Sequence, residues 1–245
     1  MQFTYDGQLA ALLGQRAGSI PEVVATLQAI DGLLDGTKDG LAWFNSLYLQ
    51  VTVAVQARVH AGAFDDARGT AFIANLDFTF ANLYLSALSA WLGGRVLPQS
   101  WRVLFEQRAN VDLARIQFAL AGVNAHINRD LAVAIVNTCR ATGVVPDHET
   151  AEYRAYTALN QTLDSLIEQA KRELMVRLPG DALPGADKVE IAIASWSVAA
   201  ARETAWVNSE VLWKVRDETI LTERFMDGLD GAAELVGKGL LIRTV

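Results

Sequence analysis

The chain has 245 residues, 51% of them hydrophobic, which is enough for one large domain or two small ones with a buried core. Its formal net charge is −7, and no Lys/Arg-rich run occurs anywhere. This composition argues against nucleic acid and against an anionic membrane surface as partners, because both require clustered positive charge.

Helical periodicity extends over nearly the whole chain, and alternating runs typical of strands are hard to find. The first predicted helix begins after Ser19, an N-cap residue followed by Pro21 in the first turn and Glu22 three positions after the cap. It is expected to run to about Leu34 and to break at Gly36.

The other predicted helices are separated by glycine or proline. They are expected over residues 39–62, 70–91, a short stretch after Pro98, 110–142, 147–178, 187 to about 228–231, and a short terminal segment. Gly143 is the expected C-cap of helix 110–142. The segment 178–186 is the one plausible linker, and it is too short to separate independent domains. The pattern predicts an all-α fold, a single domain over residues 1–245 made of about seven helices, several of them long.

The single cysteine, Cys139, cannot form an internal disulfide and fits a reducing cytoplasm. We expect no signal peptide, because the N-terminal segment carries Asp6 and lacks a basic region followed by an apolar run. Apolar stretches are interrupted before the ~20 residues that a membrane helix requires. A cytoplasmic protein is therefore expected.

The most informative segment is 122–131 (GVNAHINRDL), inside predicted helix 110–142. Its apolar residues recur at helical spacing and predict a buried stripe. Beside that stripe, His126 and Asp130 lie one turn apart and face the same way. Because a buried polar group is costly unless paired, this cluster predicts a site.

Two interpretations of the His126–Asp130 pair remain open. A carboxylate that accepts a hydrogen bond from an imidazole fixes its tautomer and raises its basicity, which is half of a general-base arrangement. The structural alternative is a buried pair that joins neighbouring helices. Gly122, one turn before His126, predicts a close helix crossing or the approach of a ligand to the backbone, because glycine costs a helix ~1 kcal/mol relative to alanine.

Polar residues on the apolar stripes of other helices could converge into a polar pocket within the bundle. These residues are Asn45, Thr52, Asp77, Asn82 and Arg202. If Arg202 is buried it must be paired, and Asp77 or Asp130 is its expected partner.

Several short segments, in their order and spacing, resemble an all-helical bacterial family of unknown function that is found largely in actinobacteria. They are DGLA (39–42) with Phe44 and Tyr48, LD (76–77) with FAN (80–82), WR (101–102), GVNAHI (122–127) with DL (130–131), and AR (201–202) with AW (205–206). The resemblance implies a single helical domain and supplies no substrate. It also implies that one group of residues belongs together: Asn124, His126, Asp130, Asp77 and Asn82.

The first functional hypothesis is an enzyme of the lyase, isomerase or cyclase type. It would hold a largely apolar small molecule in the bundle and use His126, oriented by Asp130, for acid–base chemistry without a redox cofactor. Asn124 and Asn128 would hydrogen-bond substrate oxygens, and Trp206 would border the pocket. The second hypothesis is a non-catalytic protein that binds a small molecule or a partner helix. Assembly into a homo-oligomer is left open.

A third hypothesis is a metal-dependent hydrolase. His126 and Asp130 would supply two ligands to a divalent ion. Further candidate ligands are His60, Asp65, Asp66 and His148. The chain lacks a His-Glu-x-x-His motif, a Glu-x-x-His pair and a cysteine cluster, so no metal is included in the first hypothesis. Asp65 and Asp66 are better explained as the cap of the following helix.

Overall fold

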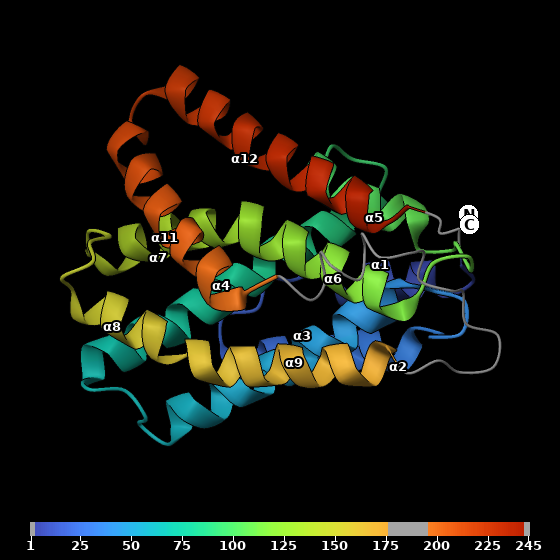
Figure 1. Cartoon of the computed structure of the whole chain (residues 1–245), viewed down its shortest axis with the longest axis horizontal. Coiled ribbons are helices and arrows are strands. Elements are labelled where there is room, and N and C mark those ends of the chain that lie inside the picture. The colour runs from blue at the N-terminus through green and yellow to red at the C-terminus, as the bar shows by residue number, and fades with distance from the viewer. Residues whose placement is uncertain (1–2, 176–195, 243–245) are drawn as a thin grey trace.

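The computed structural model describes residues 3–175 and 196–242. Over these residues the chain folds into helices without a strand, so the all-α prediction is confirmed (Figure 1). The predicted linker 178–186 and the expected helix start at Asp187 lie outside the described residues.

The N-terminal half agrees closely with the predicted helices. It contains α1 (Asp6–Leu12), α2 (Ile20–Leu33), α3 (Leu41–His60), α4 (Ala67–Leu92) and α5 (Gln99–Gln107). The Ser19 side chain accepts a hydrogen bond from the Glu22 N–H, which confirms the predicted cap of α2. The short helix α1 was not predicted.

The C-terminal half departs from the prediction at two places. It contains α6 (Arg115–Ala125), the π-turn η1 (His126–Asp130), α7 (Leu131–Thr142), α8 (Ala151–Ala158), α9 (Asn160–Met175), α11 (Val198–Val215) and α12 (Thr219–Leu240). The predicted helix 147–178 is two helices, α8 and α9, and Thr150 rather than Asp147 is the N-cap of α8. Gly143, with φ of 70°, ends α7 as predicted.

The last helix was predicted wrongly. The chain breaks between Val215 and Thr219, where no glycine or proline marks an end, and then forms the 22-residue helix α12 straight through Gly228 and Gly231. Packing of α12 against α5, α6 and η1 outweighs the low helix propensity of glycine.

The helices form layers around α4, α6 and α7. In Figure 1, α11 and α12 lie on one side of α6 and α7, and α2, α3 and α9 lie on the other. Helix α4 is long and apolar enough to span a membrane by length and composition, contrary to the expectation that no stretch would be. However, 56% of the most apolar 18-residue stretch of α4 is buried within the bundle, which is typical of a helix at the centre of a protein core.

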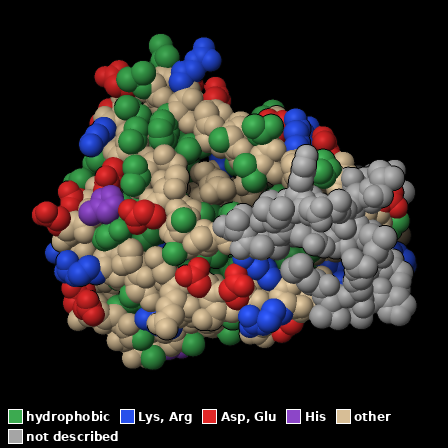
Figure 2. Space-filling model, viewed as in Figure 1, with side chains coloured by type: hydrophobic (Ala, Val, Ile, Leu, Met, Phe, Trp, Pro, Cys, Tyr) green, Lys and Arg blue, Asp and Glu red, His purple; other side chains and the backbone are tan. Residues whose placement is uncertain are grey.

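Helices α11 and α12 form an arm that projects from the bundle (Figure 1). Hydrophobic side chains are visible along this arm in the space-filling view (Figure 2). Those that are more than about a third exposed include Val207 and Val211 on α11, and Ile220 and Leu221 on α12.

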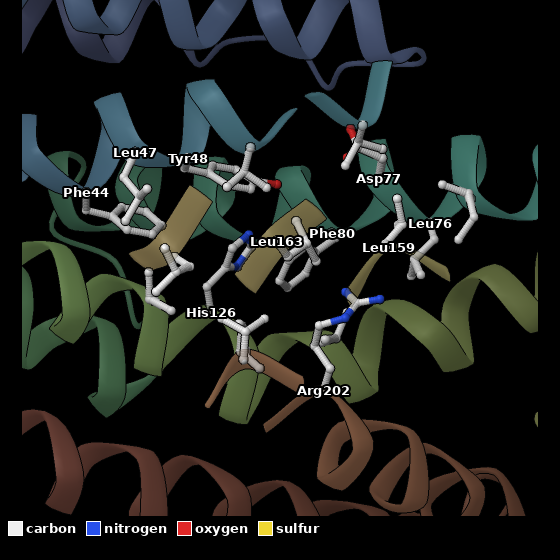
Figure 3. Close-up of a pocket in the computed structure, with 18 residues that line it drawn as sticks. Phe44, Leu47, Tyr48, Leu76, Asp77, Phe80, His126, Leu159, Leu163 and Arg202 are labelled. Atoms are coloured by element: carbon white, nitrogen blue, oxygen red, sulfur yellow. The ribbon is translucent and has the colours of Figure 1, made fainter. Parts of the chain in front are cut away.

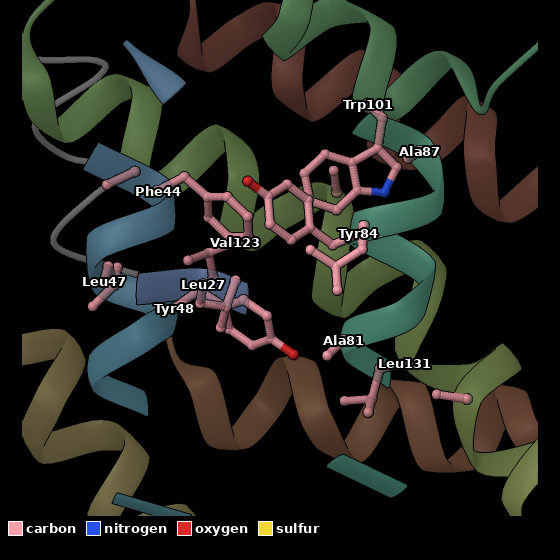
Figure 4. Packing of buried hydrophobic residues seen from close by; sticks show 14 of the residues in the cluster. Leu27, Phe44, Leu47, Tyr48, Ala81, Tyr84, Ala87, Trp101, Val123 and Leu131 are labelled. Atoms are coloured by element: carbon pink, nitrogen blue, oxygen red, sulfur yellow. The ribbon is translucent and has the colours of Figure 1, made fainter. Parts of the chain in front are cut away.

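An aromatic cluster fills the core where α3, α4 and α5 meet (Figure 4). The Phe44 and Tyr84 rings are 5.0 Å apart edge to face, and the Tyr84 and Trp101 rings are 5.1 Å apart. All three side chains are almost completely buried. Such pairs contribute about 0.5–1.5 kcal/mol beyond the area they bury, so this cluster fixes α5 relative to α3 and α4.

The same two helices, α3 and α5, are joined by a buried ion pair. Arg108, directly after α5, contacts both carboxylate oxygens of Asp39, directly before α3, and its Nη1 lies 3.1 Å from Asp6. The Gly40 N–H donates to the Arg108 carbonyl at 2.6 Å. These bonds join the end of α5 to the start of α3.

Gly122 allows α6 to approach α3 closely. A Cβ atom built on Gly122 would lie 2.3 Å from the Phe44 ring, so only glycine leaves space for that ring. The reciprocal contact occurs at Gly40, where a Cβ would lie 2.3 Å from the Phe118 ring. The predicted close helix crossing is therefore present.

Candidate functional site

The continuous helix expected over 110–142 is interrupted by a π-turn at residues 126–130. The Leu131 N–H donates to the His126 carbonyl five residues earlier, in place of an ordinary i→i+4 bond. Residues 110–114 are outside the helix, which begins at Arg115. Single π-turns within α-helices occur frequently at functional sites, and this one contains both His126 and Asp130.

Asp130 is fully buried and is held by neighbouring donors. The Trp101 indole Nε1–H donates to Oδ2 at 2.8 Å, and Arg129 Nη1 donates to Oδ1 at 2.6 Å. His126 Nδ1 lies 3.3 Å from Oδ2. The Asp130 carboxylate therefore accepts from two donors on neighbouring side chains, and Arg129 places a positive charge beside it.

His126 presents one ring nitrogen to Asp130 and the other to the interior. With Nδ1–H directed at the carboxylate, Nε2 carries the free lone pair. Nε2 is buried and has no hydrogen-bond partner among the described residues. Burial lowers the pKa of His126, and the hydrogen bond and charge of Asp130 oppose that effect. The imidazole is therefore neutral at pH 7 and can accept a proton.

Three aromatic rings restrict the orientation of His126. Phe80 stacks on the imidazole with a centroid distance of 3.4 Å and an interplanar angle of 4°. Tyr48 and Phe44 approach edge to face at 4.7 Å and 6.1 Å. Two further rings, those of Trp101 and Tyr84, have centroids 5.7 Å and 6.3 Å from that of the imidazole.

His126 lines a cavity of about 80 Å³ between α3, α4, η1, α9 and α11 (Figure 3). Most of its lining is aliphatic or aromatic. Four side chains bring polar groups to it: Tyr48, Asp77, His126 and Arg202. An apolar pocket with a few convergent polar groups is the usual form of a small-molecule site.

Asp77 lies three residues before Phe80 on α4, so both side chains face the cavity. Its Oδ2 is buried and has no hydrogen-bond partner in the described part of the chain. Burial alone raises the pKa of Asp77 to about 7. Near neutral pH a large fraction of this carboxyl is therefore protonated and acts as a hydrogen-bond donor.

Tyr48 lies one turn after Phe44 on α3, and its ring stacks on that of Phe44. In Figure 3 its hydroxyl points toward the side of the cavity occupied by Asp77. The hydroxyl is buried and, within residues 3–175 and 196–242, has no partner. Burial, followed by the nearby Asp77, raises the pKa of Tyr48 well above its ordinary value, so the phenol stays neutral.

Arg202 is buried, but it does not pair with Asp77 or Asp130, and that expectation was wrong. Its Nε donates to Asn160 Oδ1 at 2.8 Å and its Nη2 to the Tyr156 carbonyl at 2.7 Å. The guanidinium also lies 3.9 Å from the Tyr156 ring centroid. No carboxylate of the described residues lies within ion-pair distance of Arg202, because neutral acceptors between α8 and α9 reach it first.

The other predicted binding residues do not line the cavity. Asn124 donates to the Ala233 carbonyl and so joins α6 to α12, and it accepts from Asn128 one turn later in η1. Asn82 bonds both the N–H and the carbonyl of Ala17. Trp206 donates to Glu210 and packs against Tyr156.

The candidate metal ligands do not converge. Among the described residues no three His, Cys, Asp or Glu side chains gather in an arrangement that could hold a metal ion. Asp66 caps α4 by accepting from the Gly69 N–H, as its alternative interpretation predicted. His148 lies near the surface between Glu203 and Glu210, and His60 is exposed at the end of α3.

Sequence reasoning missed four contributors to the site. They are Tyr48, Phe80, Trp101 and Arg129, which belong to the segments singled out in the sequence but were not assigned to the site. One available signal was helical spacing, since Phe80 follows Asp77 by three residues. The Trp101 contact joins residues 29 apart, so no local pattern could indicate it.

Comparison with known proteins assigns the chain to a family but does not indicate an activity. No curated protein and no solved structure matches the chain. One family model, described as a family of unknown function (DUF5995), matches residues 20–243, which include every residue of the cavity. The chain therefore belongs to the DUF5995 family.

Proposed function

We propose that this protein is an enzyme that binds a small, largely apolar molecule in the cavity and moves a proton with His126. The observation that carries the proposal is His126 Nε2, a buried and unpartnered base that faces a cavity rather than a protein acceptor. The opposite nitrogen is fixed by Asp130, which itself is held by Trp101 and Arg129.

The geometry supports a division of roles. His126 Nε2 takes a proton from the substrate, and the adjacent Asp130 carboxylate stabilises the imidazolium that forms. The Tyr48 hydroxyl is a neutral donor that can stabilise negative charge developing on a substrate oxygen. Proton abstraction of this kind suits isomerisation, elimination or cyclisation and uses only groups of this chain.

A purely structural role explains the site less well. Asp130 would be satisfied by Trp101 and Arg129 without a histidine. Unpartnered polar atoms occur together on His126, Tyr48 and Asp77, and each unsatisfied buried group costs about 1–3 kcal/mol. A ligand in the cavity would offset these costs at once, which supports a functional site.

The test is exchange of substrate hydrogens with solvent. The purified protein is incubated in D₂O with an extract of small cellular metabolites, and deuterium incorporation is followed by mass spectrometry. We expect incorporation into one compound or a few related compounds, and its loss in His126→Gln. His148→Gln is the matched control, because His148 is near the surface, and it should retain exchange.

Equal exchange with folded His126→Gln and with the wild-type protein would contradict the proposal. Recovery of a bound metabolite without any deuterium would favour the second candidate, a non-catalytic binding protein, which the largely apolar walls also suit. We place the protein in the cytoplasm on account of its acidic composition and its single buried cysteine. The hydrolase hypothesis receives no support from the positions of its candidate ligands.

A further inference from the structure

The cavity has two chemically different ends. His126 and Tyr48 lie at one end, and Asp77 and Arg202 lie at the other, with Phe80 between them (Figure 3). The proton-transfer role uses only the first pair. The second pair requires a separate explanation, since among the described residues neither side chain forms an ion pair with the other or with a neighbour.

We propose that Asp77 and Arg202 together bind the carboxylate of a short aliphatic monocarboxylic acid, which extends along the cavity toward His126. This assignment names the substrate class of the proposed enzyme and so rests on that proposed function. It identifies Asp77 and Arg202 as residues that anchor the substrate, whereas His126 acts on it.

The charge of the ligand follows from Arg202. Its guanidinium is buried, and two of its nitrogens are held by neutral oxygens of Asn160 and Tyr156. Its Nη1 donates no hydrogen bond to the described residues, while the side chain lines the cavity. A buried cation without a counterion is strongly unfavourable, and an anion placed in the cavity would compensate it.

The protonation state of Asp77 agrees with an anionic ligand. The neutral carboxyl carries a proton that it can donate, and its buried Oδ2 has no acceptor in the described chain. A protonated Asp77 and the Arg202 guanidinium would therefore both donate to a carboxylate. Ionised Asp77 would repel the same ligand, and it would attract an amine instead.

The size and lining of the cavity restrict the rest of the ligand. A volume of about 80 Å³ corresponds to roughly 5–8 water-sized positions at about 10–15 Å³ each, so a molecule of about that many non-hydrogen atoms fits. The rest of the lining is apolar: Phe80 and Leu163 lie between the two ends, and Leu76 and Leu159 lie at the end that holds Asp77 and Arg202 (Figure 3). An unbranched aliphatic chain matches this lining, and its far carbons would reach the His126 end.

Other titratable groups around the cavity do not obscure the behaviour of Asp77 above pH 6. Tyr48 on α3 stays neutral because its pKa is raised, and His126 on η1 stays neutral because its pKa is lowered. Arg202 on α11 keeps its charge. On α9, the lining residues Leu163 and Ile167 carry no charge, and the carboxylate of Asp164 favours the charged form of Arg202 without forming an ion pair with it.

The first experiment measures binding of three probes of matched length by calorimetry at pH 6: pentanoate, pentanamide and pentylamine. We expect pentanoate to bind at least about tenfold more tightly than pentanamide, as a charge-assisted hydrogen bond in a buried site implies, and pentylamine not to bind measurably. Equal affinity for pentanoate and pentanamide, or tighter binding of pentylamine, would overturn the assignment.

The second experiment uses Asp77→Asn, which retains a donor at every pH. Wild-type affinity for pentanoate should fall as Asp77 ionises above pH 7, approaching a tenfold loss per pH unit, whereas Asp77→Asn should show no such loss up to pH 9. Arg202→Met should abolish the preference for pentanoate over pentanamide. Arg202 also joins α11 to α8 and α9, so Arg202→Met is interpreted only if it folds. If it does not fold, the pH dependence of pentanoate binding to Asp77→Asn is the test of the assignment.

The two proposals fail in different ways. If pentanoate is not preferred but metabolite exchange still depends on His126, the substrate class is wrong and the proposed function stands. If pentanoate binds as described but exchange is unaffected by His126→Gln, the anchoring pair is correct and the catalytic role is wrong.

Discussion

The Phe80 ring lies flat on the His126 imidazole, with centroids 3.4 Å apart and planes within 4° of parallel. This contact covers one face of the base. Because Phe80 and Asp77 are on the same helix, α4 both shields the base and supplies the acid at the opposite end.

Replacing Phe80 should change the titration of His126. Phe80→Ala admits water to the imidazole face, and because burial is the largest cause of the lowered pKa, that pKa should rise toward the ordinary value of about 6.5. The measurement is an NMR titration of the histidine ring carbons. Phe78→Ala, on the same helix but outside the cavity lining, is the control and should leave the titration of His126 in place. An unchanged or lower pKa in Phe80→Ala would contradict this explanation.

Asp77 should make the protein less stable as pH rises. Its pKa is raised from 3.8 to about 7, so between these values the folded state binds more protons than the unfolded state, and stability falls with increasing pH. The full difference is on the order of 4 kcal/mol at about 1.4 kcal/mol per pKa unit, and it is constant above pH 7.

Asp77→Asn should remove this dependence and stabilise the protein at pH 8 relative to wild type, with a much smaller gain at pH 4. Urea denaturation at both pH values measures the difference. The lowered pKa of His126 makes the folded protein less stable as pH falls below about 6.5. This contribution is present in both proteins, so it cancels when their free energies of unfolding are compared. Asp65→Asn, at an exposed position, is the matched control. A wild-type protein that gains stability relative to Asp77→Asn from pH 4 to 8 would refute the assignment of Asp77 as a buried, neutral acid.

Gly122→Ala should destabilise the fold although alanine favours helices. The new Cβ would lie 2.3 Å from the Phe44 ring and displace it toward His126, at a cost of about 1–3 kcal/mol for overpacking. Gly32→Ala, in the exposed part of α2 with nothing within 4 Å of the new Cβ, should instead be neutral or stabilising by up to about 1 kcal/mol. The measurement is thermal unfolding of both variants beside the wild type. If Gly122→Ala is neutral or stabilising, as Gly32→Ala is expected to be, the helix crossing tolerates a larger residue.

Asp230→Ala should loosen α5. The Asp230 carboxylate on α12 accepts from the backbone N–H groups of Gln99 and Ser100 and from the Ser100 hydroxyl, so it caps a helix about 130 residues earlier. Loss of such a cap costs about 0.5–2 kcal/mol. Asp227→Ala, on an exposed position of the same helix, controls for the general effect of removing a charge from α12. Amide hydrogen exchange in residues 99–107 should increase only in Asp230→Ala; equal protection in both variants would exclude the cap as a stabilising contact.

The sequence predicted the helices of the N-terminal half because local signals mark their ends. Ser19 caps α2, and Pro98 directly precedes α5. The break after Val215 and the continuous α12 could not be foreseen in this way, because contacts with α5 and α6 decide them.

For the site, spacing correctly paired His126 with Asp130, since four residues on one helix determine their own separation. The hydrogen-bond partners of Arg202 were predicted wrongly because they are distant in the sequence. Asn160 and Tyr156 are 42 and 46 residues away, and their position depends on how α8 and α9 pack. The four polar lining residues lie on α3, α4, η1 and α11, so only the tertiary structure shows that they share one cavity.

The π-turn at residues 126–130 has a consequence for the register of the whole helix. A π-turn holds one residue more than the α-turn it replaces, so deletion of a single residue here would restore an uninterrupted α-helix. Everything beyond the deletion would then rotate by about 100° relative to α6. Asn137 and Arg140, now exposed, would turn away from solvent, and the buried face of α7 would leave the core. The extra residue thus serves as a spacer that lets one helix satisfy two requirements, the packing of α7 and the alignment of a histidine with its carboxylate.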